Sequence, residues 1–198
     1  MTESRETRAK NERHTELLAI ARMILAEKGF EATTISEIVA RAGVAQGTFY
    51  LYFSSKIALV VALNQEMNEQ IVSAVQNATA QAHNAADIVE AGVTASFQKI
   101  ERYRDILSIL HSQVAMTHTH TQREQQFGIY HHLIAELIRQ RQQVGDVDKS
   151  INADVSARLI AGLIDHAADE CYLYDKETQP EVYIKEVIRF VKRALEIA

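Results

Sequence analysis

Residues that interrupt helices are scarce in this chain. Only one proline and seven glycines occur among 198 residues, and these two residue types are the least favourable in a helix interior. Strong helix formers such as Ala, Leu, Glu, Gln and Arg are abundant, and no segment alternates between apolar and polar residues as a half-buried strand does. The sequence therefore predicts an all-α fold of about nine helices.

Apolar spacing and helix-end signals place these helices along the chain. Gly29 is expected to end the first helix and Gly43 the second, whereas Thr34 with Glu37 fits a capping box. Thr178 with Glu181 repeats that capping pattern near the C-terminus. The expected helices cover residues of about 11–28, 35–42, 46–52, 56–80, 85–101, 103–116, 122–143, 152–174 and 180–197.

The charge distribution suggests two domains. The net charge is −5, yet residues 1–56 carry eight Lys or Arg against seven Asp or Glu, and the remainder carries 13 against 19. The acidic remainder would repel a polyanion, which leaves the N-terminal end as the contact surface. We expect residues 1–56 to form one domain, with residues 1–10 as a flexible arm, and residues 57–198 to form a second.

Composition also limits the cellular setting. No apolar run is long enough to span a membrane, and the polar N-terminus lacks the apolar stretch of a secretory signal. The single Cys171 cannot form an internal disulfide, as is usual in a reducing compartment. We expect a cytoplasmic protein that has no membrane segment and needs no cofactor.

Residues 43–56 read as the second half of a helix-turn-helix, in which a tight turn at Gly43 leads into a very short helix. Phe49 and Phe53 are expected to anchor this helix on its neighbours. The exposed side would then present small polar and tyrosyl groups, which suit base edges and phosphates in a DNA major groove. Thr34, at a helix N-terminus, and Lys56 would add phosphate contacts. The predicted DNA-contacting residues are Thr34, Gln46, Gly47, Thr48, Tyr50, Tyr52 and Lys56.

Residues 10–64 resemble the N-terminal domain of the TetR family of bacterial transcriptional regulators. The family pattern is matched by Gly29-Phe30, Thr33-Thr34, Ala42-Gly43-Val44, Gly47-Thr48-Phe49-Tyr50 and Phe53-Ser-Ser-Lys56. Two positions depart from it: Val39 stands where Ala is usual, and Ala45 stands where Ser is frequent, which removes one phosphate contact. The resemblance implies a three-helix DNA-binding domain followed by a helical domain for ligand binding and dimerisation.

The C-terminal helices support dimerisation independently of the resemblance. The segments 152–174 and 180–197 are apolar around most of their circumference, which indicates burial on more than one side. Gly162 in mid-helix favours a close helix crossing. A two-fold dimer would present two recognition helices to a palindromic operator in double-stranded DNA. The predicted interface residues are Leu159, Gly162, Leu163, Tyr183, Val187, Phe190 and Val191.

An effector pocket is expected among the middle helices, where polar residues stand within apolar faces. Buried polarity needs a partner, either within the core or on a ligand. The candidate ligand contacts are Phe97, Tyr103, Leu107, His111, Phe127, Tyr130, His131, Asp165 and His166. The order of the C-terminal residues also resembles fatty-acid-responsive family members, so an acyl-CoA is one candidate effector, with Arg102, Arg104 and Arg123 for its phosphates.

The residues and the resemblance together predict a homodimeric, ligand-responsive repressor that a small apolar effector releases from its operator. Three alternatives stay open. His118 and His120, with His111, His131 and His132 nearby, leave room for a metal-sensing regulator. A helical interaction protein without a DNA role is a second alternative. An enzyme is the third, but no nucleophile–base constellation or glycine-rich loop supports it, and we expect no catalytic activity.

Overall fold

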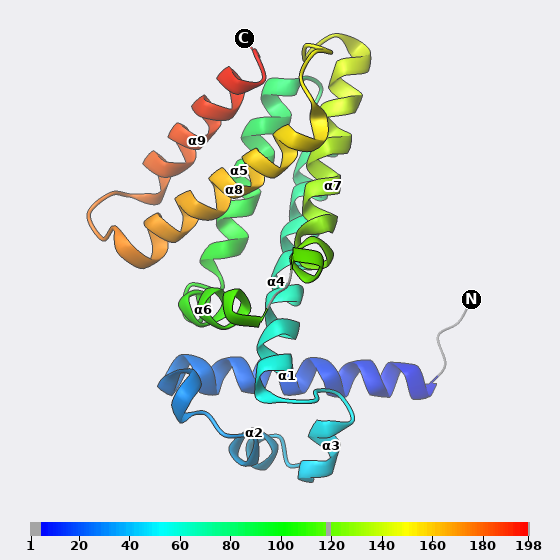
Figure 1. Ribbon diagram of the computed structural model, residues 1–198, viewed down its shortest axis with the longest axis vertical. Helices are drawn as coiled ribbons and strands as arrows, with labels where there is room; N and C mark the ends of the chain where they lie inside the picture. Colours follow the sequence, from blue (N-terminus) through cyan, green and yellow to red (C-terminus); the bar gives the residue numbers. More distant parts are fainter. Residues whose placement is uncertain (1–4, 118–119, 198) are drawn as a thin grey trace. The chain divides into compact units, whose positions relative to one another are not determined.

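The structure is a computed structural model that describes residues 5–117 and 120–197. Within these ranges it contains helices and no strand, which confirms the all-α prediction. The helices, shown in Figure 1, are α1 (Arg5–Ala32), α2 (Ile35–Arg41), α3 (Gln46–Tyr50), α4 (Lys56–Thr79), α5 (Ala85–Glu101), α6 (Leu107–Thr117), α7 (His120–Val144), α8 (Ala153–Asp169) and α9 (Pro180–Ala194). A π-helical turn, η1 (Glu170–Tyr174), follows α8 directly.

Local sequence signals explain most of the helix ends. Gly29 breaks the helical geometry inside α1 with φ 78° and ψ 175°, a conformation open to glycine and to few other residues. Thr34 caps α2, because its hydroxyl accepts a 3.2 Å hydrogen bond from the Glu37 backbone N–H. Ser55 does the same for α4 by accepting from the Ala58 N–H at 3.0 Å. The break at Gly29 and the Thr34 cap are thus confirmed, although α1 continues past Gly29 to Ala32. The start of α1 corrects a prediction, because the helix begins at Arg5 and takes in residues 5–10, which were expected to form part of a flexible arm.

The end of α2 has the hydrogen bonds of a Schellman motif. Gly43 has φ 66°, its N–H donates to the Ala40 carbonyl, and the Val44 N–H donates to the Val39 carbonyl. This left-handed residue turns the chain sharply enough for α3 to begin at Gln46, three residues later. The tight turn expected at Gly43 is thus confirmed, and it positions the short helix.

The described chain forms two compact units. The first comprises residues up to Gln65 together with Ser108–Thr117. Its core brings together α1, α2, α3 and the first turns of α4, and the fully buried side chains include Leu17, Ile24, Ile38, Phe49 and Leu59. The boundary predicted at residue 56 falls inside this unit, because the first turns of α4 contribute Leu59, Val60 and Leu63 to the same core.

The second unit comprises Glu66–Leu107 and the described chain from His120 to Ile197. Figure 1 shows α8 lying across α5 and α7, with α9 beside α8, and α9 packs on both α5 and α8. The Lys192–Glu90 ion pair joins α9 to α5 at 2.6 Å, and the Arg139–Asp154 pair joins α7 to α8 at 2.5 Å. None of the described helices is both long and apolar enough to cross a membrane.

The loop before α9 differs from its prediction. Thr178 and Glu181 were expected to cap this helix, but the N-cap residue is Gln179 and its side chain makes no capping bond. Asp175 organises the loop instead, accepting from the N–H groups of Glu177 and Thr178 and from the Tyr183 hydroxyl at 2.9 to 3.0 Å. The Thr178 hydroxyl and these N–H groups hold the pKa of Asp175 well below its usual value.

Candidate functional site

The short helix α3 is held by aromatic packing on its inner side. Phe49 is fully buried and Phe53 is 3% exposed, and their ring centroids lie 5.5 Å apart. The His14 ring of α1 lies 5.0 Å from the Phe53 ring. A helix of five residues cannot be stable by itself, so these contacts determine which of its sides faces outward.

The outward side of α3 carries three of the seven residues predicted to contact DNA. Gln46 and Gly47 are exposed, and Tyr50, one turn after Gln46, is 52% exposed. A Cβ added at Gly47 would meet nothing within 4 Å, so the backbone there is open to close approach. Thr48 and Tyr52 are half-buried. Leu51, which was not predicted, is 77% exposed beside Tyr50, and an unpartnered leucine can contact a thymine methyl group.

Lys56 is committed to contacts within the first unit. Its ammonium group donates hydrogen bonds to the carbonyl oxygens of Phe30 and Thr33 at 2.6 and 2.8 Å, and it lies 4.2 Å from the centre of the Phe30 ring. These contacts tie the start of α4 to the loop between α1 and α2. Lys56 therefore has a structural role in this geometry. The Thr34 hydroxyl likewise accepts the hydrogen bond that caps α2.

Several cations of this unit are paired with carboxylates. Arg41 makes two hydrogen bonds to Glu27, at 2.9 and 3.1 Å, and Lys28 bonds to Glu37. The Glu27 carboxylate raises the pKa of Arg41 through the same hydrogen bonds. Fewer unpaired cations are therefore available in this unit for contact with a polyanion than its composition suggested. Uncharged hydrogen-bond donors on α3 then matter more for such a contact.

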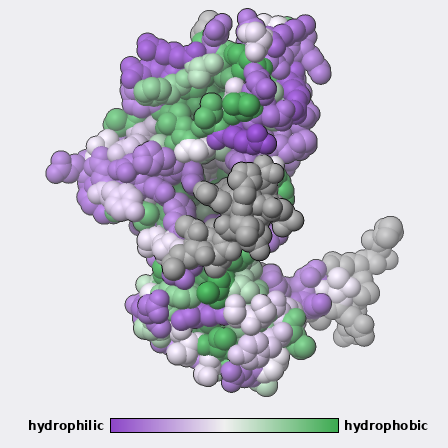
Figure 2. Space-filling model, in the orientation of Figure 1, coloured by the Kyte–Doolittle hydropathy of each residue, from purple (hydrophilic) through white to green (hydrophobic). Residues whose placement is uncertain are grey.

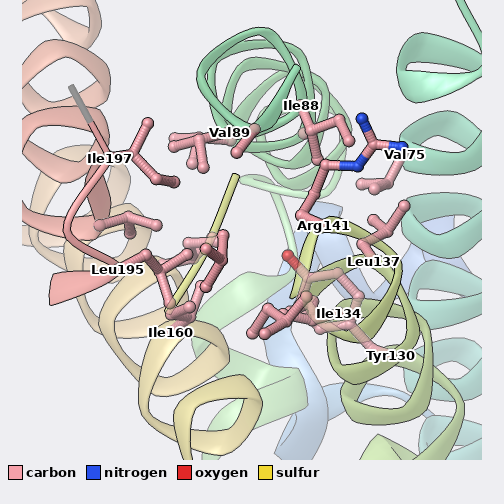
Figure 3. Close-up of a pocket in the computed structure, with 17 residues that line it drawn as sticks. Val75, Ile88, Val89, Tyr130, Ile134, Leu137, Arg141, Ile160, Leu195 and Ile197 are labelled. Carbon is pink, nitrogen blue, oxygen red and sulfur yellow. The ribbon is translucent and has the colours of Figure 1, made fainter. Parts of the chain in front are cut away.

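The second unit contains a nearly apolar cavity of about 60 Å³. Figure 3 shows side chains from α4, α5, α7, α8 and α9 converging around it. Only Tyr130 and Arg141 bring polar side-chain atoms to its wall. The lining residues are Val75, Ala85, Ile88, Val89, Gly92, Val93, Tyr130, Ile134, Leu137, Ile138, Arg141, Val147, Ile160, Ile164, Val191, Leu195 and Ile197.

Among the predicted ligand contacts whose side chains the structure describes, Tyr130 alone lines this cavity. Its hydroxyl shares a 2.9 Å hydrogen bond with Ser96, and burial raises its pKa to about 12. Phe97, Tyr103 and Leu107 are buried core residues of the second unit. Of the other predicted contacts, His166 is exposed, while His131 and Asp165 are half-buried and lie outside the cavity wall.

The remaining predicted ligand and metal residues fall elsewhere. His111 is half-buried and belongs to the first unit. The side chains of Phe127, His120 and Arg123, and the whole of His118, lie outside the described residues. The apolar majority of the cavity wall was missed, because periodicity marks a residue as inward-facing without showing whether its neighbours fill the space.

The predicted dimer interface is divided by the structure. Leu159 and Phe190 are 69% and 59% exposed, Gly162 is exposed, and Leu163 and Tyr183 are half-buried. Val187 and Val191 are each only 3% exposed, because they face inward from α9. Their side chains belong to the core of the unit and have almost no surface left to offer a partner.

An apolar surface nevertheless remains on α8 and α9. Val155 and Val182 are 48% and 50% exposed, in addition to Leu159 and Phe190. Figure 2 shows hydrophobic residues gathered on the visible face of this unit, where Figure 1 labels α5, α8 and α9. A Cβ at Gly162 would meet nothing within 4 Å, so no crossing helix of the same chain explains this glycine.

Comparisons with known proteins agree with this organisation. Residues 17–63 match the model described as bacterial regulatory proteins, tetR family, and residues 87–195 match the tetracyclin repressor-like C-terminal domain. The chain is 30% identical over 184 residues to the HTH-type transcriptional regulator YvdT of Bacillus subtilis (strain 168), covering 92% of this chain and 95% of that protein.

Two further relatives extend the comparison. The HTH-type transcriptional repressor KstR2 of Rhodococcus jostii (strain RHA1) is 30% identical over 109 residues, 55% of this chain and 53% of that protein. The regulator FadR from Bacillus subtilis, solved in complex with stearoyl-CoA, superposes with a TM-score of 0.77 at 17% identity, covering 89% of this chain and 96% of that chain. With its helix-turn-helix and its C-terminal domain both matched, the chain belongs to the TetR family of bacterial transcriptional regulators.

Proposed function

We propose that this regulator is a homodimeric repressor that binds a palindromic operator through α3 and leaves it when an apolar effector occupies the second unit. The exposed row of Gln46, Gly47 and Tyr50 on a helix anchored by buried Phe49 is the observation that carries the DNA-binding part. A glutamine amide can pair with the edge of adenine, and a tyrosine hydroxyl can reach a phosphate.

Dimerisation is supported by the apolar surface of α8 and α9. Leu159 and Phe190 are large, exposed, apolar side chains on two helices that pack on each other, and a large exposed apolar patch is rare on a monomer. The open surface at Gly162 would let a helix from a second copy approach closely. A two-fold dimer presents its two recognition helices to half-sites about one helical turn apart.

The effector part rests on the apolar cavity. Its wall carries aliphatic side chains from five helices, so a ligand that entered would bias the packing of all five. The stearoyl-CoA complex of FadR supports an effector with an acyl or other extended apolar part. The coupling between effector and operator equals the difference in effector affinity between the two states, typically about 1–3 kcal/mol.

A binding experiment tests the operator contact. Duplexes that bind wild-type protein are selected from a randomised pool, and the affinities of variants for the selected site are measured by fluorescence anisotropy. We expect Gln46→Ala and Tyr50→Ala each to weaken binding by about tenfold, since a well-placed base contact and a hydrogen bond to a charged phosphate are each worth about 1–3 kcal/mol. Gln143→Ala and Tyr174→Ala change exposed residues of the same types in the second unit and should bind like wild type.

The same assay can contradict the proposal. Wild-type affinity in both α3 variants would exclude this helix as the reading element. Affinity that does not fall as salt concentration rises would also count against it, because phosphate contacts release counterions. Native mass spectrometry of the purified protein would identify a retained effector, and the identified compound is then added to the operator complex to test for release.

A further inference from the structure

Leu51 lies near the middle of the outward side of α3. Its dihedral angles, φ −71° and ψ −21°, continue the helical geometry for one residue beyond Tyr50. Successive residues of an α-helix are about 100° apart around the axis, so Leu51 lies about 200° from the buried ring of Phe49, two residues earlier. Gly47, two residues before Phe49, is also nearly opposite that ring and has no side chain. Leu51 is therefore the side chain at the centre of this surface, with Gln46 and Tyr50 beside it.

The side chain of Leu51 is unusually exposed for its size. At 77% it is the most exposed large apolar side chain in the described part of the chain. A single exposed leucine is ordinary on a protein surface, but this one belongs to the surface that the proposed function places in a major groove. A base edge that met this leucine would lose water along with it, which is favourable only where the edge is apolar.

The methyl group of thymine is the apolar group that a major groove offers. Guanine, cytosine and adenine present hydrogen-bond donors or acceptors at their groove edges, whereas thymine adds a C5-methyl group to its O4 acceptor. A leucine pressed against one of the other three bases would displace water from a polar edge without replacing the lost hydrogen bond. Leu51 thus favours thymine and opposes the other bases.

Gly47 allows the close approach that such a contact needs. The backbone at Gly47 is exposed, and a Cβ there would meet nothing within 4 Å. Residues four apart are neighbours on a helix surface, so a side chain at this position would stand one turn before Leu51 on the same face. It would hold the helix farther from the bases, and its absence lets a leucine side chain reach them.

We propose that Leu51 determines operator specificity by contacting the C5-methyl group of one thymine in each half-site. This deepens the proposed function and rests on its assignment of α3 to the major groove. Gln46 and Leu51 are separated by about 7.5 Å along the helix axis, which corresponds to roughly two base-pair steps. The thymine should therefore lie within about three base pairs of the adenine that pairs with Gln46.

Removing single methyl groups from the DNA tests this contact. In the operator selected for wild-type protein, each thymine is replaced in turn by uracil, symmetrically in both half-sites, and the affinity of the full chain is measured by fluorescence anisotropy. Uracil differs from thymine only in lacking the C5-methyl group, so the hydrogen-bonding edge is unchanged. At one thymine position, wild-type binding should weaken about fourfold per half-site, the effect of roughly one buried methyl-sized group.

The effect of uracil at that position should disappear in Leu51→Ala. This variant should bind the thymine duplex less tightly than wild type does and should bind the thymine and uracil duplexes equally. Leu51→Met keeps a long apolar side chain and should retain the sensitivity to uracil. Val144→Ala changes another exposed aliphatic residue, in the second unit, and should match wild type with every duplex. Circular dichroism verifies that each variant is folded.

Methylated cytosine provides an independent check at the same position. A change from thymine to cytosine alters the hydrogen-bonding edge, and 5-methylcytosine then restores only the methyl group. Wild type should bind the duplex with 5-methylcytosine more tightly than the duplex with cytosine. Leu51→Ala should bind these two duplexes equally, and a preference of the same size in the variant would contradict the assigned contact.

The outcomes separate this proposal from the one on which it rests. The role of Leu51 would be overturned by an operator without thymine in its half-sites, by insensitivity of wild type to uracil at every position, or by unchanged sensitivity at every position in Leu51→Ala. If Gln46→Ala and Tyr50→Ala still weaken binding in such a case, the assignment of α3 to the groove stands. Wild-type affinity in all three α3 variants would overturn both proposals.

Discussion

The Lys56 ammonium group lies 2.6 Å from the carbonyl oxygen of Phe30 and 4.2 Å from the centre of its ring. With a second bond to the Thr33 carbonyl at 2.8 Å, this contact holds the corner between α1 and α2 on the first turn of α4. A residue that resembles a phosphate ligand in sequence is here the cation that satisfies two carbonyl oxygens.

Replacing this cation tests the structural role directly. Lys56→Met should lower the free energy of unfolding by about 2 kcal/mol, because two carbonyl oxygens lose a charged donor while the side-chain stem is kept. Chemical denaturation followed by circular dichroism measures it. If Lys56 served only as a phosphate contact, stability would be unchanged and the slope of operator affinity against salt would fall by about one ion.

The N-terminus of α3 lacks a side-chain cap. Ala45 occupies the N-cap position with extended dihedrals of −72° and 151°, but it has no side-chain oxygen to accept from the first turn. Ala45→Ser should stabilise the protein by about 1 kcal/mol through a new capping bond. Denaturant midpoints measure the gain, and Ala62→Ser, in the middle of α4, offers no cap and should not stabilise. A loss of stability in Ala45→Ser would contradict the assigned cap geometry.

Gly162 provides the sharpest test of dimerisation. Gly162→Leu places a bulky side chain on an open surface of the single chain, so the fold should survive while a closely packed dimer dissociates. Sedimentation velocity reads the oligomeric state, and circular dichroism verifies the helices. Gly128→Leu, at another helical glycine with open space, is the matched control and should remain dimeric. A dimeric Gly162→Leu would place the interface elsewhere.

At a second helical glycine, Gly92, a substitution is expected to stabilise the protein. A Cβ at Gly92 would contact Val75 and Thr79 at 3.7 and 3.8 Å, which are ordinary van der Waals distances. Gly92→Ala should therefore stabilise α5 by about 0.5–1 kcal/mol, mainly by restricting the unfolded chain. Thermal unfolding measures the change, and destabilisation would indicate that the cavity wall tolerates less than these distances imply.

The buried hydroxyl of Tyr130 should make the protein lose stability in alkali. Burial raises the pKa of its hydroxyl from 10.0 to about 12, so the unfolded state ionises first as the pH rises. The resulting stabilisation is complete below pH 10 and is lost as the pH passes from 10 to about 12, in total about 3 kcal/mol. Denaturation across this range measures it. Tyr130→Phe cannot ionise, so its stability should decline less steeply over the same interval.

Much of the fold could be predicted from local sequence signals. The glycines at 29 and 43 act through backbone freedom, and Thr34 and Ser55 act through caps within three residues of themselves, so no distant contact is needed to anticipate them. The same locality explains why α5 begins and ends as expected, since Asn84 caps it by accepting from the Asp87 N–H. The prediction for the loop before α9 was wrong because Thr178 fits a capping pattern in the sequence, whereas in the structure the Asp175 carboxylate accepts from the Thr178 N–H.

The sequence by itself determined the all-α class, the α3 motif and the helix ends that Thr34, Gly43 and Asn84 set, because propensity, capping and turn chemistry act over a few residues. Only the tertiary structure decided what each side chain does with its polar atoms. Lys56 and Phe30 are 26 positions apart, and Arg141 and His83 are 58 apart. The packing of several helices at once decides which helix faces meet and whether their side chains fill the space between them. The hydrophobic periodicity of a single helix does not carry that information.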